Sequence, residues 1–138
     1  MSHTCSSALI RCMDFRLTTA INSWMEENNI MGDCDIISEA GVTKTIVENP
    51  ASPEAQYLLT QIKLSKKLHR ISTLYLMHHT DCGAYGGHSG FASTEDEMNR
   101  HIEDMKKAKA VIDAENLGID VRLIIADMHE GTIDFKQI

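Results

Sequence analysis

Four short runs of apolar residues are spread along the chain and separated by longer mixed segments. Short runs of this kind are typical of strands that are covered on both faces, as in parallel sheets. The predicted strands are residues 8–10, 35–38, 71–77 and 121–126. Gly131 then turns the chain toward a short last strand at residues 132–135.

The longer segments between these runs carry apolar residues at helical spacing. They predict helices over residues 17–28, 53–69 and 93–116. Ser52 and Pro53 mark the start of the second helix, because serine caps free N–H groups and proline suits the first helical position. Its inward face is expected to carry Ala55, Leu58, Leu59, Ile62 and Leu68. Residues 39–49 have no clear period and are expected to form a loop with room for one helical turn.

Strands that alternate with helices are typical of an α/β fold. With 138 residues, the chain is long enough for one domain with its own core and short for two. We therefore predict a single domain over residues 1–138, with a mostly parallel central sheet of about four strands. Helices pack on this sheet, and a short extra strand follows at the C-terminus.

The charge and hydropathy of the chain exclude several classes of partner. The net charge is −7, and no basic stripe that would bind nucleic acid is visible. No run approaches the roughly 20 apolar residues of a membrane span, and the N-terminus shows no apolar leader segment. The protein is therefore expected in the cytoplasm, where its four cysteines stay reduced and are buried, metal-binding or catalytic.

Two groups of metal-ligand residues follow predicted strands. Cys12 comes directly after the first strand, and His79 and Cys82 follow the third strand, three residues apart. Open α/β sheets bind ligands beyond the C-terminal ends of their strands, so the two groups face each other if these strands are neighbours. Two thiolates and one imidazole suit zinc and leave its fourth position free, which is typical of a catalytic ion. The alternative is two buried cysteines and a loop histidine.

A carboxylate and a guanidinium lie beside the first group. In an extended segment, Asp14 and Arg16 would face the same side. The planar guanidinium of Arg16 would keep the Asp14 carboxylate ionised and fixed in direction. A fixed carboxylate can accept a hydrogen bond from a hydroxide on the metal. The alternative is a surface ion pair that contributes little.

Other polar residues near these two groups are secondary candidates for roles at the site. Asp81 lies between two candidate ligands and would accept a hydrogen bond from one of them, and His78 is expected at the edge of the core. The residues of the glycine-rich loop that would border the site are Tyr85, His88 and Ser89. The residues without an expected role are Cys5 and Cys34, as buried side chains, and His101 and Glu103, on a solvent-exposed helix face.

Both groups resemble the metal motifs of β-class carbonic anhydrases. Residues 12–17, Cys-Met-Asp-Phe-Arg-Leu, are similar to the first motif, and residues 78–83, His-His-Thr-Asp-Cys-Gly, are similar to the second. Ala40-Gly41 lies where the family has an Asn-Ala-Gly turn, and residues 124–138 resemble its last strand and turn. The resemblance covers most of the chain, and the short form is most similar to the small prokaryotic branch.

The resemblance assigns roles to five residues. It implies a zinc ion (Zn²⁺) bound by Cys12, His79 and Cys82. It also implies the reversible hydration of carbon dioxide to bicarbonate and a proton by zinc-bound hydroxide, which Asp14 and Arg16 would position. In some members the equivalent aspartate binds the metal instead, so both positions of Asp14 remain open.

The resemblance further implies a small-molecule substrate and a homodimer or a larger homo-oligomer. A pocket for carbon dioxide is expected to be small and apolar, with Phe15 and Val42 as candidate lining residues. Regeneration of the hydroxide requires a proton acceptor, for which His88 is a candidate.

Two departures from the family pattern leave other functions open. Ser38-Glu39 stands where the family usually has Arg-Asn, and Phe15 replaces a commoner small residue. A hydrolase of carbonyl sulfide or carbon disulfide would use the same scaffold and zinc chemistry. A zinc-binding protein without catalytic activity is the second alternative.

Overall fold

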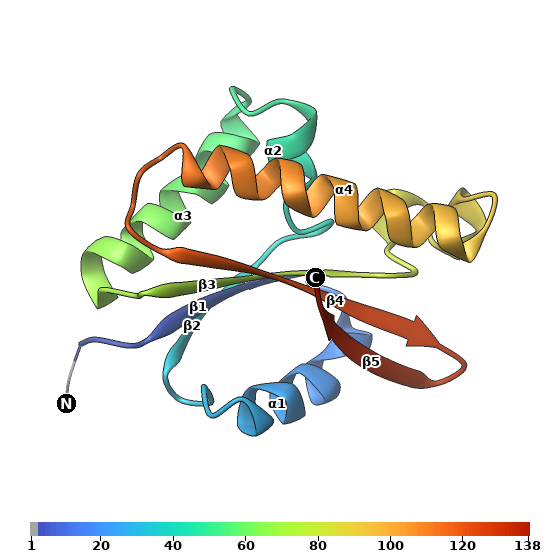
Figure 1. Ribbon diagram of the computed structural model, residues 1–138, viewed down its shortest axis with the longest axis horizontal. Coiled ribbons are helices and arrows are strands. Elements are labelled where there is room, and N and C mark those ends of the chain that lie inside the picture. The colour runs from blue at the N-terminus through green and yellow to red at the C-terminus, as the bar shows by residue number, and fades with distance from the viewer. Residues whose placement is uncertain (1–2) are drawn as a thin grey trace.

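The computed structural model describes residues 3–138, which form one α/β domain around a five-stranded sheet (Figure 1). The strands are β1 (Ser7–Arg11), β2 (Cys34–Ser38), β3 (Thr73–His79), β4 (Asp120–His129) and β5 (Thr132–Gln137). Their order in the sheet is β2-β1-β3-β4-β5, with β5 antiparallel to β4 and the other pairs parallel. This architecture confirms the predicted mostly parallel sheet with an extra C-terminal strand.

Helices cover both faces of the sheet. The helices are α1 (Thr18–Glu27), α2 (Lys44–Glu48), α3 (Pro53–His69) and α4 (Thr94–Asp113). Figure 1 shows α1 on one face and the other three on the opposite face. Because both faces are covered, β1 is buried along its whole length, as its apolar run predicts.

The predicted helix starts are confirmed for the two longest helices. The Ser52 hydroxyl accepts a hydrogen bond from the backbone N–H of Ala55 at 3.1 Å and caps α3. Ser93 caps α4 in the same way, through the N–H of Asp96 at 3.0 Å. The segment 39–49 carries only the short helix α2, in agreement with the expected loop and helical turn.

One inward position of α3 was predicted wrongly. Leu68 is 58% exposed, whereas Leu58, Leu59 and Ile62 are buried. Leu68 lies six residues after Ile62, which places it about 240° around the helix from that side chain. The buried position of the last turns belongs instead to Ser65.

Strand β3 ends two residues later than its apolar run indicates. The strand includes His78 and His79, both of which are buried, so these histidines belong to the sheet rather than to the following loop. Since β1 and β3 are parallel neighbours, their C-terminal ends lie at the same edge of the sheet. This edge is where the two groups of candidate ligands meet.

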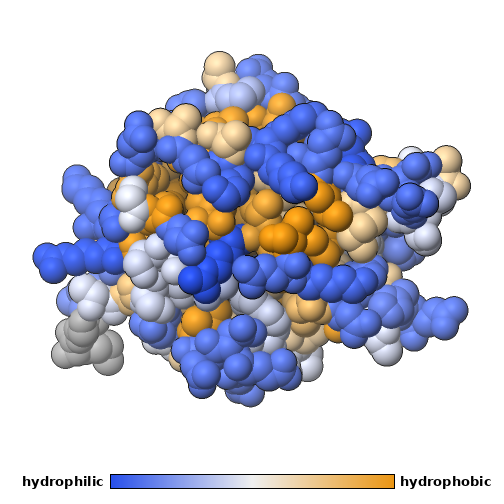
Figure 2. Space-filling view, viewed as in Figure 1, coloured by the Kyte–Doolittle hydropathy of each residue, from blue (hydrophilic) through white to orange (hydrophobic). Residues whose placement is uncertain are grey.

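One face of the molecule has an apolar centre. Figure 2 shows apolar side chains gathering between the upper helices and the sheet, with hydrophilic residues above and below them. Strand β5 pairs with β4 only from Ile124 onward, so the first residues of β4 lie at the sheet edge.

Among the described residues, no helix is both long and apolar enough to cross a membrane.

Candidate metal centre

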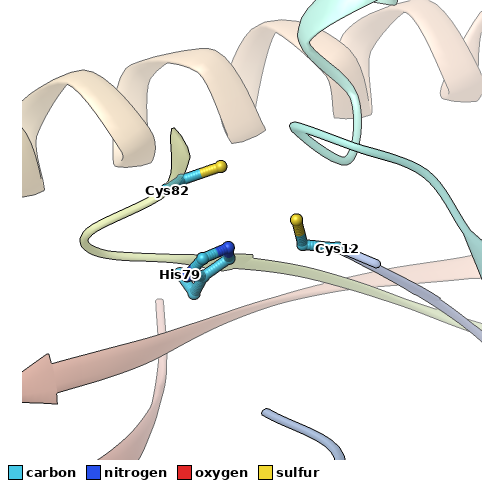
Figure 3. Close-up of side chains that lie close together, drawn as sticks. All are labelled: Cys12, His79 and Cys82. Atoms are coloured by element: carbon cyan, nitrogen blue, oxygen red, sulfur yellow. The ribbon is translucent and has the colours of Figure 1, made fainter. Parts of the chain in front are cut away.

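Three ligand-type side chains from two neighbouring strands converge at the C-terminal edge of the sheet. Cys12 directly follows β1, His79 is the last residue of β3, and Cys82 follows three residues later. The sulfur atoms of Cys12 and Cys82 and a ring nitrogen of His79 all lie within 4.8 Å of one another. Figure 3 shows the three side chains turned toward the same space. The structure therefore brings together the three residues that the sequence predicts as ligands.

The turn between His79 and Cys82 is tight. Asp81 has a φ of 54°, a left-handed conformation that is uncommon for a residue with a side chain. Its backbone N–H donates a hydrogen bond to the buried Glu97 carboxylate at 2.5 Å, and its own carboxylate accepts one from the N–H of His88 at 2.9 Å. These contacts fix the turn that directs Cys82 toward His79.

The imidazole of His79 has one nitrogen free for a ligand. Its Nδ1 donates a hydrogen bond to the carbonyl of Thr80 at 2.7 Å, which leaves the lone pair on Nε2. This Nε2 atom is buried and has no hydrogen-bond partner. An unpartnered buried polar atom costs about 1–3 kcal/mol, and a metal ion would satisfy it. An imidazole that donates one N–H to a carbonyl and turns its other nitrogen to a metal is the usual arrangement in metal sites.

The two thiols favour one shared negative charge. Cys12, His79 and Cys82 are 5%, 1% and 2% exposed, and a hydrogen bond between the two sulfurs lowers the pKa of Cys12 and raises that of Cys82. Backbone hydrogen bonds from Gly41 and Asp14 further lower the pKa of Cys12. Backbone groups that stabilise a buried thiolate, beside a second thiol and an imidazole nitrogen, fit a zinc ion.

The loop after β2 approaches the centre closely. Gly41 has a φ of +74°, and a Cβ atom at this position would lie 2.9 Å from the Cβ of Ala84. Val42 also has a positive φ, 57°, which is strained for a β-branched residue. Val42 is buried and does not line the site cavity, contrary to expectation. Its backbone conformation, rather than its side chain, helps place the Gly41 backbone against Cys12.

Asp14 and Arg16 form an ion pair through a turn and not through the expected extended segment. The carboxylate caps the short turn Phe15–Leu17 by accepting the N–H of Arg16 at 3.0 Å. The Arg16 guanidinium then contacts both oxygens, with Nη2–Oδ2 at 2.6 Å and Nε–Oδ1 at 3.0 Å. These hydrogen bonds from Arg16 lower the pKa of Asp14 to about 2. Asp14 is thus paired with Arg16 and is not part of the three-residue cluster.

Arg16 also joins the two motifs. Its Nη1 atom donates to Oδ2 of Asp81 at 2.8 Å, and its Nη2 atom donates to the Asp81 carbonyl at 3.0 Å. These contacts with Arg16 lower the pKa of Asp81. Asp81 was predicted as an acceptor for a ligand, but its carboxylate holds Arg16 and the loop after Cys82 instead.

A buried carboxylate supports this arrangement from α4. Glu97 is almost fully buried, and besides the N–H of Asp81 it accepts a hydrogen bond from Nδ1 of His88 at 2.6 Å. The contact with Glu97 raises the pKa of His88, whose side chain is half-exposed. The sequence alone does not indicate a role for Glu97, because an acidic residue in the first turn of a helix is usually solvated.

Behind the cluster, α4 contributes further buried polar groups. His78 Nε2 lies 2.8 Å from the Thr43 hydroxyl, and its Nδ1 lies 3.1 Å from Nδ1 of His101. Burial lowers the pKa of both histidines, that of His101 to about 4. His101 is completely buried, so its predicted place on a solvent-exposed face is wrong, whereas Glu103 is exposed as expected.

A spacing in the sequence indicates this buried face of α4. Its residues recur at intervals of three and four, as one face of a helix requires. They are Glu97, His101, Asp104, Met105, Ala108 and Ile112. The first three are polar, so the pattern of apolar residues alone does not reveal this face.

The cavity beside the three candidate ligands is larger than carbon dioxide, the substrate that the resemblance implies, would need. Its volume is about 910 Å³, and Cys12, Asp14, Arg16 and Asp81 line it. Phe15 also lines it, as expected, but its side chain is 86% exposed at the mouth. The expectation of a small pocket is therefore wrong for this single chain, because the side chains at its mouth extend into solvent.

Of the three residues of the glycine-rich loop that were predicted to border the site, only one lines the main cavity. Ser89 lines the cavity, whereas the Tyr85 hydroxyl turns to α4 and donates to Asp104 at 2.7 Å. His88 lines a neighbouring cavity of about 380 Å³, which shares Arg16 and Asp81 with the first.

Residues 2–132 match the model of a family described as "Putative carbonic anhydrase". The chain belongs to this carbonic anhydrase family. Among curated proteins, it is similar to an uncharacterized protein of Rickettsia bellii, with 27% identity over 110 residues. A second one, from Rickettsia conorii, is 26% identical over 110 residues. Each match covers 78% of this chain, but only 67% and 59% of the length of the two relatives.

Solved structures of β-carbonic anhydrases have the same fold. The β-carbonic anhydrase CcaA superimposes with a TM-score of 0.67 at 14% identity, covering 99% of this chain and 79% of that one. The wild-type enzyme CafD of Aspergillus fumigatus gives 0.52 at 8% identity, with 99% and 91% covered. Tetrameric β-carbonic anhydrases of Sordaria macrospora give 0.50 at 13% identity, with 97% and 81% covered. These similarities confirm the predicted fold, and the family model confirms the predicted carbonic anhydrase family.

Proposed function

We propose that this protein catalyses the reversible hydration of carbon dioxide to bicarbonate and a proton, with zinc bound by Cys12, His79 and Cys82. The single observation that carries the proposal is the buried, unpartnered Nε2 atom of His79 beside two thiol sulfurs. Membership of the carbonic anhydrase family supports the reaction type. When bound, zinc lowers the pKa of a coordinated water molecule and supplies a nucleophile near neutral pH.

Asp14 would orient the attacking oxygen. Its carboxylate lines the same cavity as Cys12 and remains ionised throughout the neutral range, since its pKa is about 2. Two hydrogen bonds from the Arg16 guanidinium fix its direction. Asp14 would accept a hydrogen bond from the nucleophile and so direct a lone pair toward the carbon atom of the substrate.

His88 would remove the proton from the site. The imidazole lies in the neighbouring cavity, which reaches the site through Arg16 and Asp81. Glu97 holds one ring nitrogen at 2.6 Å, while the side chain remains half-exposed to solvent. A histidine in this position can take up a proton near neutral pH and pass it to a buffer molecule.

The open mouth of the cavity favours a homo-oligomer. Met13 and Phe15 are both large, apolar and exposed beside the candidate metal centre. We propose that a second copy of the chain covers them, in a homodimer or a larger assembly, and narrows the cavity for its small substrate. The two thiol ligands also require a reducing compartment such as the cytoplasm.

The test is the rate of carbon dioxide hydration by the zinc-loaded protein, measured by stopped flow from about pH 6.5 to pH 9. We expect a rate above the buffer blank that rises with pH. Cys82→Ala should abolish it, because the variant lacks one of the three ligands. A blank-level rate in a folded protein that retains zinc at this centre would contradict the proposal. Parallel assays with carbonyl sulfide and carbon disulfide would then separate a sulfur-substrate hydrolase from a noncatalytic zinc protein.

A further inference from the structure

A second group of metal-ligand side chains lies at the opposite edge of the sheet. Cys5 precedes β1, Asp35 belongs to β2 and His69 is the last residue of α3. The Cys5 sulfur, an Asp35 oxygen and a His69 nitrogen all lie within 4.8 Å of one another. None of these residues contributes to the centre formed by Cys12, His79 and Cys82.

Hydrogen bonds already hold the three residues in place. His69 Nδ1 lies 2.8 Å from both carboxylate oxygens of Asp35, and the Ser65 hydroxyl donates to Oδ2 at 2.6 Å. The backbone N–H of Cys5 donates to the carbonyl of His69 at 3.0 Å, which fixes the segment before β1 against the end of α3. The donor atoms are therefore preorganised by three separate elements of the fold.

The surroundings of this cluster suit a cation. The three residues line a cavity of about 330 Å³, and His3 and Cys34 line the same cavity as further donors. Both Cys5 and Cys34 are partly exposed rather than buried as expected, so an ion can reach the cavity. The C-terminal end of α3 adds a partial negative charge.

We propose that Cys5, Asp35 and His69 form a second metal site, for zinc or a similar divalent transition-metal ion. Sulfur, imidazole and carboxylate together are donors for zinc, whereas calcium and magnesium prefer oxygen alone. Donor atoms on one tetrahedral zinc ion lie about 3.3–3.8 Å apart, given bonds of about 2.0–2.3 Å, which is within the 4.8 Å that separates these donor atoms at most. The ion would replace the hydrogen bond between His69 Nδ1 and Asp35, with the displaced proton and the Cys5 thiol proton released to solvent, and Ser65 would keep the carboxylate oriented. His3 or Cys34 completes the coordination.

A metal ion at this position would connect the segment before β1 to β2 and α3. Hydrogen bonds already join these elements here, from the Cys5 N–H to the His69 carbonyl and from the Ser65 and His69 side chains to Asp35. An ion that binds only the folded state stabilises it in proportion to its occupancy. The role inferred for the second site is therefore structural, and it is independent of carbon dioxide hydration.

The test is a titration of the reduced, metal-free chain of residues 1–138 with Co²⁺, in which bound equivalents and thiolate-to-cobalt absorption are measured. We expect two equivalents in the wild-type chain. Cys5→Ser and, separately, His69→Gln should each reduce this number to one, and Cys82→Ser should also leave one. A chain with both Cys5→Ser and Cys82→Ser should bind none. Circular dichroism checks that each variant is folded. If Cys5→Ser does not fold, the result for His69→Gln decides the test.

The matched control is His129→Ala. His129 also lies near two carboxylates, those of Asp127 and Asp134, but it has no cysteine in its cluster. We expect two equivalents in this variant. The second site is refuted if the wild-type chain binds only one equivalent of Co²⁺ and Cys82→Ser removes it. It is also refuted if the wild-type chain binds two equivalents and each of the single variants, Cys5→Ser and His69→Gln, still binds two. Either result leaves the proposed function intact, because that proposal depends on the Cys82 site alone.

Discussion

The two edges of the sheet each bring cysteine and histidine together, but in different surroundings. At the C-terminal edge, the ligand atoms are buried and His79 Nε2 has no protein partner. At the N-terminal edge, the side chains are partly exposed and His69 is paired with Asp35. A metal ion relieves an unsatisfied group in the first case and must displace a hydrogen bond in the second. We therefore expect tighter metal binding at the C-terminal edge.

The largest contrast between the two edges should come from their aspartates. Asp14→Ala should leave zinc bound and slow hydration by about 100-fold, because the variant loses the group that orients the nucleophile. Asp33 is a partly exposed carboxylate at the other edge, and Asp33→Ala should leave the rate unchanged. The measurement is kcat by stopped flow together with the zinc content of both variants. Full activity in Asp14→Ala would remove this carboxylate from the mechanism.

Two glycines with nearly the same backbone conformation sharpen the comparison. Gly41 has a φ of +74° and Gly32 a φ of +75°, but a Cβ at Gly41 would meet Ala84 at 2.9 Å, whereas one at Gly32 would have no atom within 4 Å. Gly32→Ala should cost about 1 kcal/mol, the strain of the positive φ alone. Gly41→Ala should cost about 2–3 kcal/mol, because the loop must also move away from Ala84.

Denaturant titration of both metal-free variants measures this difference in the free energy of unfolding. Equal losses would show that the close approach of the Gly41 loop is not fixed in solution. Zinc affinity gives a second measurement, since displacement of the Gly41 backbone from Cys12 should weaken binding only in Gly41→Ala.

Glu97 should have a smaller effect that acts through other residues. Glu97→Gln removes the charge that holds His88 and weakens the acceptor for the Asp81 N–H, so kcat should fall by about 10-fold, or about 1.4 kcal/mol. The pKa of His88, followed by NMR, should fall toward about 6.5 in this variant. Glu103→Gln on the exposed face of α4 is the control. A reduced rate with an unchanged His88 titration would indicate general loosening rather than a positioning role.

The smallest predicted effect is a pH dependence of stability. Glu97 raises the pKa of His88 in the folded chain, so the pair stabilises the fold below about pH 6.5 and loses this contribution as the pH rises through the folded pKa. In metal-free protein, His88→Gln should cost about 0.5 kcal/mol more at pH 6 than at pH 9, a small difference because the imidazole is half-exposed. A loss that is equal at both values would exclude the ion pair as its cause.

The parallel sheet and the convergence of the ligand residues follow from the sequence. Apolar runs alternating with amphipathic segments give the order of the elements, and parallel neighbours place the residues after β1 and β3 together. The pairing of Asp14 with Arg16 was also predicted, but for the wrong reason. Asp14 caps the turn Phe15–Leu17, a local hydrogen bond that the extended interpretation did not include.

The buried polar residues of α4 behind the site could not be predicted from apolar patterns. Glu97 and His101 are charged or titratable residues in a helix, and sequence patterns place such residues in solvent. They are buried because Asp81, His88 and His78 arrive from distant segments to accept or donate their hydrogen bonds. The open cavity was not predictable either, because sequence patterns place a large apolar residue such as Phe15 in the interior, whereas it lines the cavity and is 86% exposed.

The chain has a single tryptophan, in α1, and Figure 1 shows this helix on the face of the sheet opposite α4. Trp24 belongs to α1 and packs against Tyr75 of β3 and Phe135 of β5, with ring centroids 5.3 Å and 5.9 Å away. Its fluorescence therefore reports on the layer formed by α1 and the sheet. Hydrogen exchange of the α4 amides reports on the other layer. Together, the two signals can distinguish loss of the candidate metal centre from unfolding of the whole domain.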